Sequence, residues 1–92
     1  MMTYEEEIVG CRDEINRLNE EILVRLKDRV AVAKAIAELK RRHGKPIRDE
    51  ARERVVLDRV RAYALTSGLD PEGVERAFQA IIDLCVEAEE KV

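Results

Sequence analysis

The sequence predicts an all-α protein built from three helices, one of them very long. Of its 92 residues, 46% are hydrophobic and 40% are charged, whereas only 3% are aromatic. This composition, rich in alanine, leucine, glutamate, arginine and lysine, is typical of helical proteins. Apolar residues recur at spacings of three and four along most of the chain, which is the period of an amphipathic helix, and no segment alternates as a strand does.

The first predicted helix runs from about residue 5 to about residue 42 and contains no proline. Gly44 and Pro46 end it, because glycine suits the position after a helix and proline cannot continue one. Its apolar stripe comprises Ile8, Cys11, Ile15, Leu18, Ile22, Leu26, Val30, Ala33 and Ala37.

Two shorter helices are predicted after this break. Asp49 is a good N-cap for a helix over about residues 50–66, and Gly68 closes it. Asp70 caps a helix over about residues 71–91, in which Pro71 occupies the first position, where its missing N–H has no cost. The stripe of this third helix comprises Val74, Ala77, Phe78, Ile81, Cys85, Ala88 and Val92.

The length of the first helix predicts an oligomer. At about 1.5 Å per residue it spans roughly 57 Å, whereas a compact chain of this size has a diameter of only about 32 Å. The rest of the chain is too small to cover such a helix, and a second copy is the simplest partner. We therefore expect a single domain over residues 1–92 that forms an intertwined helical homodimer.

Composition argues against several classes of function. A net charge of −3 disfavours a nucleic-acid binder, and no apolar run approaches the roughly 20 residues that span a membrane. Cys11 and Cys85 have no metal-binding or redox spacing, which favours free thiols in a reducing compartment. The acidic N-terminal segment does not resemble a signal peptide. We therefore expect a cytoplasmic protein without a metal or other cofactor.

Three basic residues of the first helix are candidates for binding an anion. Lys40 lies 11 residues after Arg29, so the two differ by about 20° around the helix and about 16 Å along it, and both can reach one small ligand. Arg12 lies about 25 Å before Arg29 and cannot join them within one straight helix. In an intertwined dimer it could reach the site of the other chain. The alternative is that Arg29 and Lys40 are surface charges beside Asp28 and Glu38, and that Arg12 only covers apolar surface with its stem.

The second helix begins with a run of charges that sorts by face. Asp49, Arg52 and Glu53 stand at spacings of three and four and share one face. The other charges are expected at the surface: Arg48, Glu50 and Arg54. The alternative for the first set is a group of helix-stabilising pairs.

Cys85 and Glu89, one turn apart on the third helix, form the last candidate pair. Cys85 lies in the apolar stripe, and Glu89 places a negative charge at the unfavourable end of the helix dipole. The alternative is a core cysteine and a solvated carboxylate. His43 has no nucleophile or acid that would complete a catalytic arrangement. An enzyme with these residues would act by electrostatics and positioning.

This ordered pattern resembles the all-helical chorismate mutases, the AroQ class, over nearly the whole chain. RDEINRLNEEIL matches the family's first-helix signature, and KPIRDEARERVV matches its loop and second-helix start. The resemblance implies an intertwined homodimer that converts chorismate to prephenate, early in phenylalanine and tyrosine synthesis. That reaction is a Claisen rearrangement without proton transfer or a covalent intermediate, so no nucleophile or base is needed.

The resemblance also implies how the cations act. Arg29 and Arg12 of the partner subunit would hold the two substrate carboxylates. Lys40 would bind the ether oxygen and a carboxylate, because negative charge grows there as the C–O bond breaks.

At the other end of the substrate, the resemblance implies contacts to the ring hydroxyl. Glu53 would accept a hydrogen bond from this hydroxyl, together with the backbone near Asp49. Arg52 would orient these acidic groups.

The chain departs from the family's pattern in its third helix. Many members have a small hydroxyl residue where Cys85 stands, and many bacterial members have glutamine where Glu89 stands. Glutamine donates an N–H to the ether oxygen, whereas a carboxyl group donates only when it is protonated. We therefore hypothesise that Glu89 acts in its protonated form, favoured by burial.

Two other functions remain open on the sequence alone. An isochorismate-pyruvate lyase resembles this fold and uses a similar site, and its products, salicylate and pyruvate, distinguish it from a mutase. The other is a non-catalytic helical dimerisation or regulatory module, in which the charges only keep the surface solvated.

Overall fold

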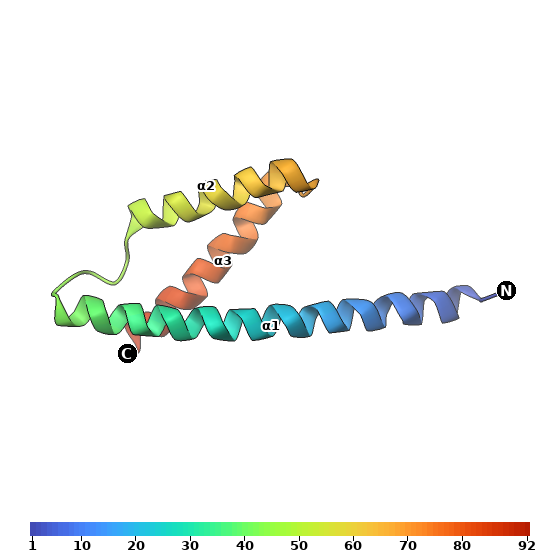
Figure 1. Cartoon of the computed structure of the whole chain (residues 1–92), viewed down its shortest axis with the longest axis horizontal. Coiled ribbons are helices and arrows are strands. Elements are labelled where there is room, and N and C mark those ends of the chain that lie inside the picture. The colour runs from blue at the N-terminus through green and yellow to red at the C-terminus, as the bar shows by residue number, and fades with distance from the viewer.

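The computed structural model describes all 92 residues as three helices joined by short loops (Figure 1). Helix α1 spans Tyr4–Arg42, α2 spans Glu50–Ser67 and α3 spans Pro71–Glu90. The predicted all-α fold is confirmed, and each helix begins and ends within one residue of its predicted bounds. Helix α3 packs against both α1 and α2 and holds these two apart.

The helix ends follow from capping chemistry. The side chains of Thr3, Asp49 and Asp70 accept backbone N–H groups in the first turns of α1, α2 and α3, which satisfies donors that the helix leaves unpaired. After α2, Gly68 has a φ of 79°, and after α1, Gly44 has a φ of 65°. Residues with a Cβ rarely adopt this left-handed conformation, so both glycines allow the chain to leave its helix.

The core of the single chain is small. Leu57 of α2 packs against Ile82 and Val86 of α3. Where α3 crosses α1, the buried residues are Ala33 and Ala37, whose small side chains let the two helices approach closely. Only 8 of the 92 residues are buried, so one chain by itself has little apolar burial to offset its conformational entropy.

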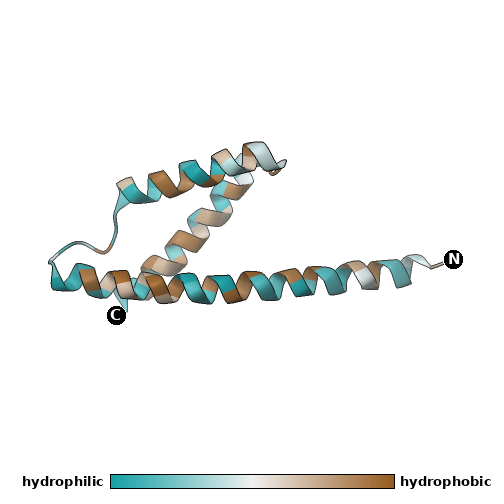
Figure 2. Ribbon diagram, viewed as in Figure 1, coloured by the Kyte–Doolittle hydropathy of each residue, from teal (hydrophilic) through white to brown (hydrophobic).

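The N-terminal half of α1 projects beyond the other two helices (Figure 1). The radius of gyration is 17.5 Å and the longest extent is 64 Å, whereas a compact chain of this length has a radius of gyration near 12 Å. Hydrophobic residues continue along the projecting segment (Figure 2), and Ile15 and Ile22 are each 55% exposed. None of the three helices combines the length and hydrophobicity needed to cross a membrane.

Candidate active site

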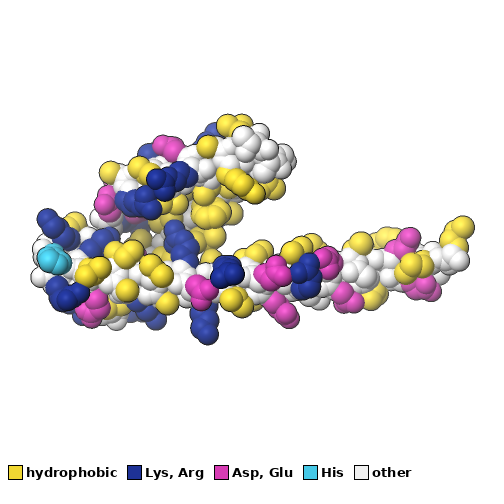
Figure 3. Space-filling view, viewed as in Figure 1, with side chains coloured by type: hydrophobic (Ala, Val, Ile, Leu, Met, Phe, Trp, Pro, Cys, Tyr) yellow, Lys and Arg dark blue, Asp and Glu magenta, His cyan; other side chains and the backbone are white.

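A cavity of about 350 Å³ lies between α1, α3 and the start of α2. Its volume falls within the range of about 300–1,000 Å³ that is usual for small-molecule sites. Basic side chains gather around the hollow between α1 and α2 (Figure 3). The lining includes every predicted site residue except Arg12: Arg29, Lys40, Asp49, Arg52, Glu53, Cys85 and Glu89.

The two cations of α1 are each held by a group of α3 or of the following loop. The Arg29 guanidinium donates a hydrogen bond to Cys85 Sγ, with Nη1 at 2.9 Å. Lys40 Nζ donates to the carbonyl of Ile47 and lies 4.0 Å from Glu89 Oε2. The helical spacing thus brings both cations to one cavity, as predicted, and α3 crosses α1 between them.

Glu89 is buried in the cavity wall and lacks a complete set of hydrogen bonds. Its side chain is 11% exposed, and Oε2 has no hydrogen-bond partner. The alternative of a solvated carboxylate is therefore excluded. A buried polar atom without a partner is unfavourable, so the atom marks a place where a ligand group can bind. Cys85, one turn earlier, is also buried, as its place in the stripe predicts.

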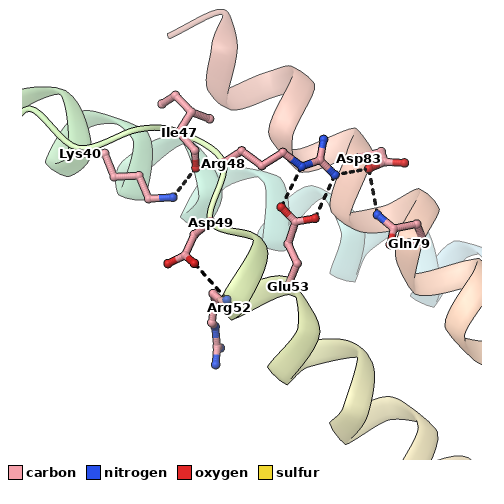
Figure 4. A network of polar contacts seen from close by, with 8 residues as sticks. All are labelled: Lys40, Ile47, Arg48, Asp49, Arg52, Glu53, Gln79 and Asp83. Atoms are coloured by element: carbon pink, nitrogen blue, oxygen red, sulfur yellow. Dashed lines mark hydrogen bonds and ion pairs between the residues drawn. The ribbon is translucent and has the colours of Figure 1, made fainter.

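Arg48, rather than Arg52, orients Glu53 (Figure 4). Arg48 Nε and Nη2 each donate to one Glu53 carboxylate oxygen at 2.9 Å. Nη2 also donates at 2.9 Å to Asp83 of α3, which accepts a further hydrogen bond from Gln79 at 3.1 Å. The Arg52 side chain points away from Glu53, and its backbone N–H donates to the Asp49 cap.

Arg48 is exposed, as predicted, and it also pairs with Glu53, a contact that was expected of Arg52. The physical reason is that Arg48 precedes the N-cap Asp49, where the backbone is not helical. An argument from helix faces does not apply there. The only sequence signal was an arginine placed just before a strong N-cap.

The ion pairs at this end of the cavity shift the pKa values of Arg48 and Asp83. Hydrogen bonds to Glu53, and then to Asp83, raise the pKa of Arg48. The hydrogen bond from Arg48, and then that from Gln79, lowers the pKa of Asp83. Asp83 therefore stays ionised well into the acidic range and keeps Arg48 anchored to α3.

Arg12 lies on the projecting half of α1, where it is exposed and outside the cavity of its own chain. This placement agrees with the separation of Arg12 and Arg29 that the helix geometry predicted. A larger open groove of about 1230 Å³ runs between α1 and α3 and is lined largely by apolar residues. They include Leu18, Ile22, Phe78 and Ile81.

The three helices surround a cavity lined by three basic and three acidic side chains. This defines a small all-helical protein with a site suited to a compact polar molecule. Residues 11–90 match the chorismate mutase type II family. The chain belongs to this family, as its resemblance to the all-helical chorismate mutases predicted.

Relatives of known name agree with this assignment. The chain is 31% identical over 78 residues to a chorismate mutase of Methanocaldococcus jannaschii, covering 85% of this chain and 79% of that protein. It is 32% identical over 85 residues to a 4-amino-4-deoxychorismate mutase of Streptomyces venezuelae, covering 91% and 82%. It is 33% identical over 90 residues to a bifunctional chorismate mutase/prephenate dehydratase of Aquifex aeolicus, covering 95% of this chain. The chain spans only 25% of the length of that bifunctional protein.

Proposed function

We propose that this chain catalyses the rearrangement of chorismate to prephenate, and thereby serves phenylalanine and tyrosine synthesis. The observation that carries the proposal is the convergence of Arg29, Lys40, Glu53 and Glu89 on one cavity of about 350 Å³. The reaction needs a folded substrate conformer and stabilisation of the charge that develops as the C–O bond breaks. Fixed charges on a rigid helical frame can supply both.

The two cations of α1 bind different groups of the substrate. Arg29 binds a substrate carboxylate, for which a planar guanidinium is well suited. Arg29 donates one hydrogen bond to the sulfur of Cys85 on α3, and its other N–H groups remain to bind a carboxylate. Lys40 binds the ether oxygen together with a carboxylate, and its place beside Glu89 Oε2 supports this role.

Glu89 acts as a hydrogen-bond donor in its protonated form. Its unpartnered Oε2 faces the same region as Lys40, and a protonated carboxyl group could donate to the ether oxygen there. Glu89→Gln should therefore retain activity, because an amide also donates a hydrogen bond at this position. The measurement is kcat/KM for both proteins, and a large loss in the variant would contradict the role.

A second copy of the chain completes the site. Two features support a homodimer: the exposed apolar residues on the projecting half of α1, and the apolar groove between α1 and α3. In the dimer, the projecting half of one chain covers the groove of the other. The long separation of Arg12 from its own cavity supports a contribution from the partner: Arg12 of the partner subunit binds the second carboxylate. This arrangement gives two equivalent sites.

Mixing two inactive variants tests this shared site. A heterodimer of Arg12→Ala and Lys40→Ala chains has one site with both residues intact and one with neither. After full exchange of equal amounts, half of the dimers are heterodimers, so about a quarter of wild-type activity should return. Exchange is followed by mass spectrometry of differently tagged chains. No recovery despite complete exchange would refute the contribution of Arg12 from the partner.

Product analysis tests the proposed reaction directly. The purified chain should convert chorismate to prephenate, and Lys40→Ala should lower kcat by about 10²–10³-fold, as removal of a charge-stabilising donor does. Salicylate and pyruvate formed from isochorismate would instead indicate the lyase. If the chain turns over neither substrate, a non-catalytic module is the remaining function.

The Streptomyces relative raises 4-amino-4-deoxychorismate as another substrate. It differs from chorismate by an amino group in place of the hydroxyl that Glu53 is proposed to face. Because Arg48 neutralises much of the charge of Glu53 through two hydrogen bonds, this end of the cavity favours a neutral hydroxyl over an ammonium group. We therefore expect a higher kcat/KM for chorismate, measured side by side with the amino compound.

A further inference from the structure

We propose that Arg48 is a positioning residue that fixes the Glu53 carboxylate for the substrate hydroxyl. The inference rests on the proposed function. It assigns a role to a residue that helical spacing placed at the surface, and the role operates through Glu53 rather than by contact with substrate.

The geometry around Glu53 supports this role. Arg48 bonds both carboxylate oxygens at 2.9 Å, and this paired arrangement fixes the plane of the carboxylate as well as its position. A carboxylate has about four lone-pair sites, so the two bonds from Arg48 leave others free on the cavity side. A glutamate without such a partner would sample several rotamers and would have to be ordered by the substrate.

Arg48 is itself fixed from two directions. Its backbone adjoins Asp49, whose side chain caps α2 by accepting the Arg52 N–H at 3.0 Å. Its guanidinium is anchored on α3 by Asp83, which Gln79 supports in turn. Arg48 thus transfers the rigidity of α3 to a residue of α2 (Figure 4).

The chain contains a matched control in Arg54. Arg54 also joins α2 to α3, donating to Glu75 at 2.6 Å and to Asp58 at 3.0 Å. The two arginine side chains are similarly exposed, at 53% for Arg54 and 45% for Arg48. Neither Arg54 nor its partners line the cavity. Removing Arg54 therefore removes a comparable ion pair between the same helices without touching Glu53.

The test compares Arg48→Met and Arg54→Met. Arg48→Met should lower kcat/KM for chorismate by about tenfold or more, the scale of a lost charge-assisted hydrogen bond. The larger part should be in KM, because the hydroxyl contact is similar in the ground and transition states. Arg54→Met should stay within about twofold of wild type, since its site contacts are unchanged. Arg48→Lys, which keeps the charge but loses the paired geometry, should recover part of the loss.

A double substitution separates positioning from a structural effect. If Arg48 acts through Glu53, Arg48→Met should cost nothing further in a Glu53→Ala background, so the two variants should agree within about twofold. The inference is overturned if Arg48→Met matches Arg54→Met, or if it lowers activity as much without Glu53 as with it. If wild type and Arg54→Met turn over chorismate, these outcomes leave the proposed function intact. If wild type itself does not, both proposals fall.

Discussion

Replacing Ala37 by leucine should show that the crossing of α3 over α1 sets the site. Ala37 has no exposed surface, and Ala33, one turn earlier, is 6% exposed. A leucine in a packed interior of this kind destabilises by about 1–3 kcal/mol, because the added carbons force neighbours apart. Helix axes lie about 8–10 Å apart depending on the side chains at the contact, so a leucine shifts α3 by about 1 Å or more.

That shift should also reach the chemistry. The contacts from Arg29 to Cys85 and from Lys40 to Glu89 flank the crossing, so both lengthen as the helices separate. A displacement of about 1 Å at a catalytic group can cost about 10²-fold. We therefore expect kcat/KM for chorismate to fall by one to two orders of magnitude, about 10–100-fold, together with the loss of stability.

The assay is urea unfolding at one fixed protomer concentration, since dimer stability depends on concentration, with kinetics measured on the same samples. Ala35→Leu is the control, because Ala35 lies on the opposite, exposed side of α1 and should change stability by less than about 0.5 kcal/mol. If Ala37→Leu is as stable as Ala35→Leu, the packing argument is wrong. If it is destabilised but fully active, the crossing does not set the site.

Three further predictions follow from single contacts. Asp70→Ala should destabilise by about 1 kcal/mol in urea, because it removes the N-cap bond of 2.8 Å in α3. Arg48 lowers the pKa of Asp83 from its ordinary value of 3.8. The contribution of Asp83 to the free energy of unfolding is therefore present above that value and is lost as pH falls through the lowered pKa. Asp83→Asn should therefore be less stable than wild type at pH 7, and the difference should disappear in strong acid. The measurement is urea unfolding of both proteins from neutral to acidic pH. A difference in stability that stays constant over this range would contradict the prediction. Cys85→Ala should raise KM for chorismate, because Arg29 loses the sulfur that holds it. Cys85→Ser should return KM to the wild-type value. Equal KM values in all three proteins would show that this contact does not affect substrate binding.

The helices and most of the cavity could be predicted because the information is local. A cap such as Asp49 depends on the few residues after it, and the alignment of Arg29 with Lys40 follows from helix geometry alone. The same geometry correctly separated Arg12 from the cavity of its own chain. Where a residue stands on a regular helix, spacing determines its face, and the face determines what it can reach.

The contacts of Arg48 could not be predicted because one of its partners is distant in sequence. Arg48 stands outside a helix, and its anchor Asp83 lies 35 residues away on an element whose packing no local pattern specifies. The burial of Glu89, which the family resemblance led us to hypothesise, likewise depends on tertiary packing, since α3 lies against α1. Sequence patterns predicted most of the charged residues that line the cavity, and tertiary packing decided which arginine would hold which carboxylate.

Glu89 is where this fold departs furthest from what stability alone favours. It is a buried carboxyl group with an unpartnered oxygen, and the last turn of α3 has no basic residue to pair with it. Lys40 Nζ lies 4.0 Å from Oε2 without donating a hydrogen bond to it. A chain with so few buried residues has little stability to spare. Such an arrangement is best explained by a ligand that supplies the missing partner, because local violations of stability rules concentrate at functional sites.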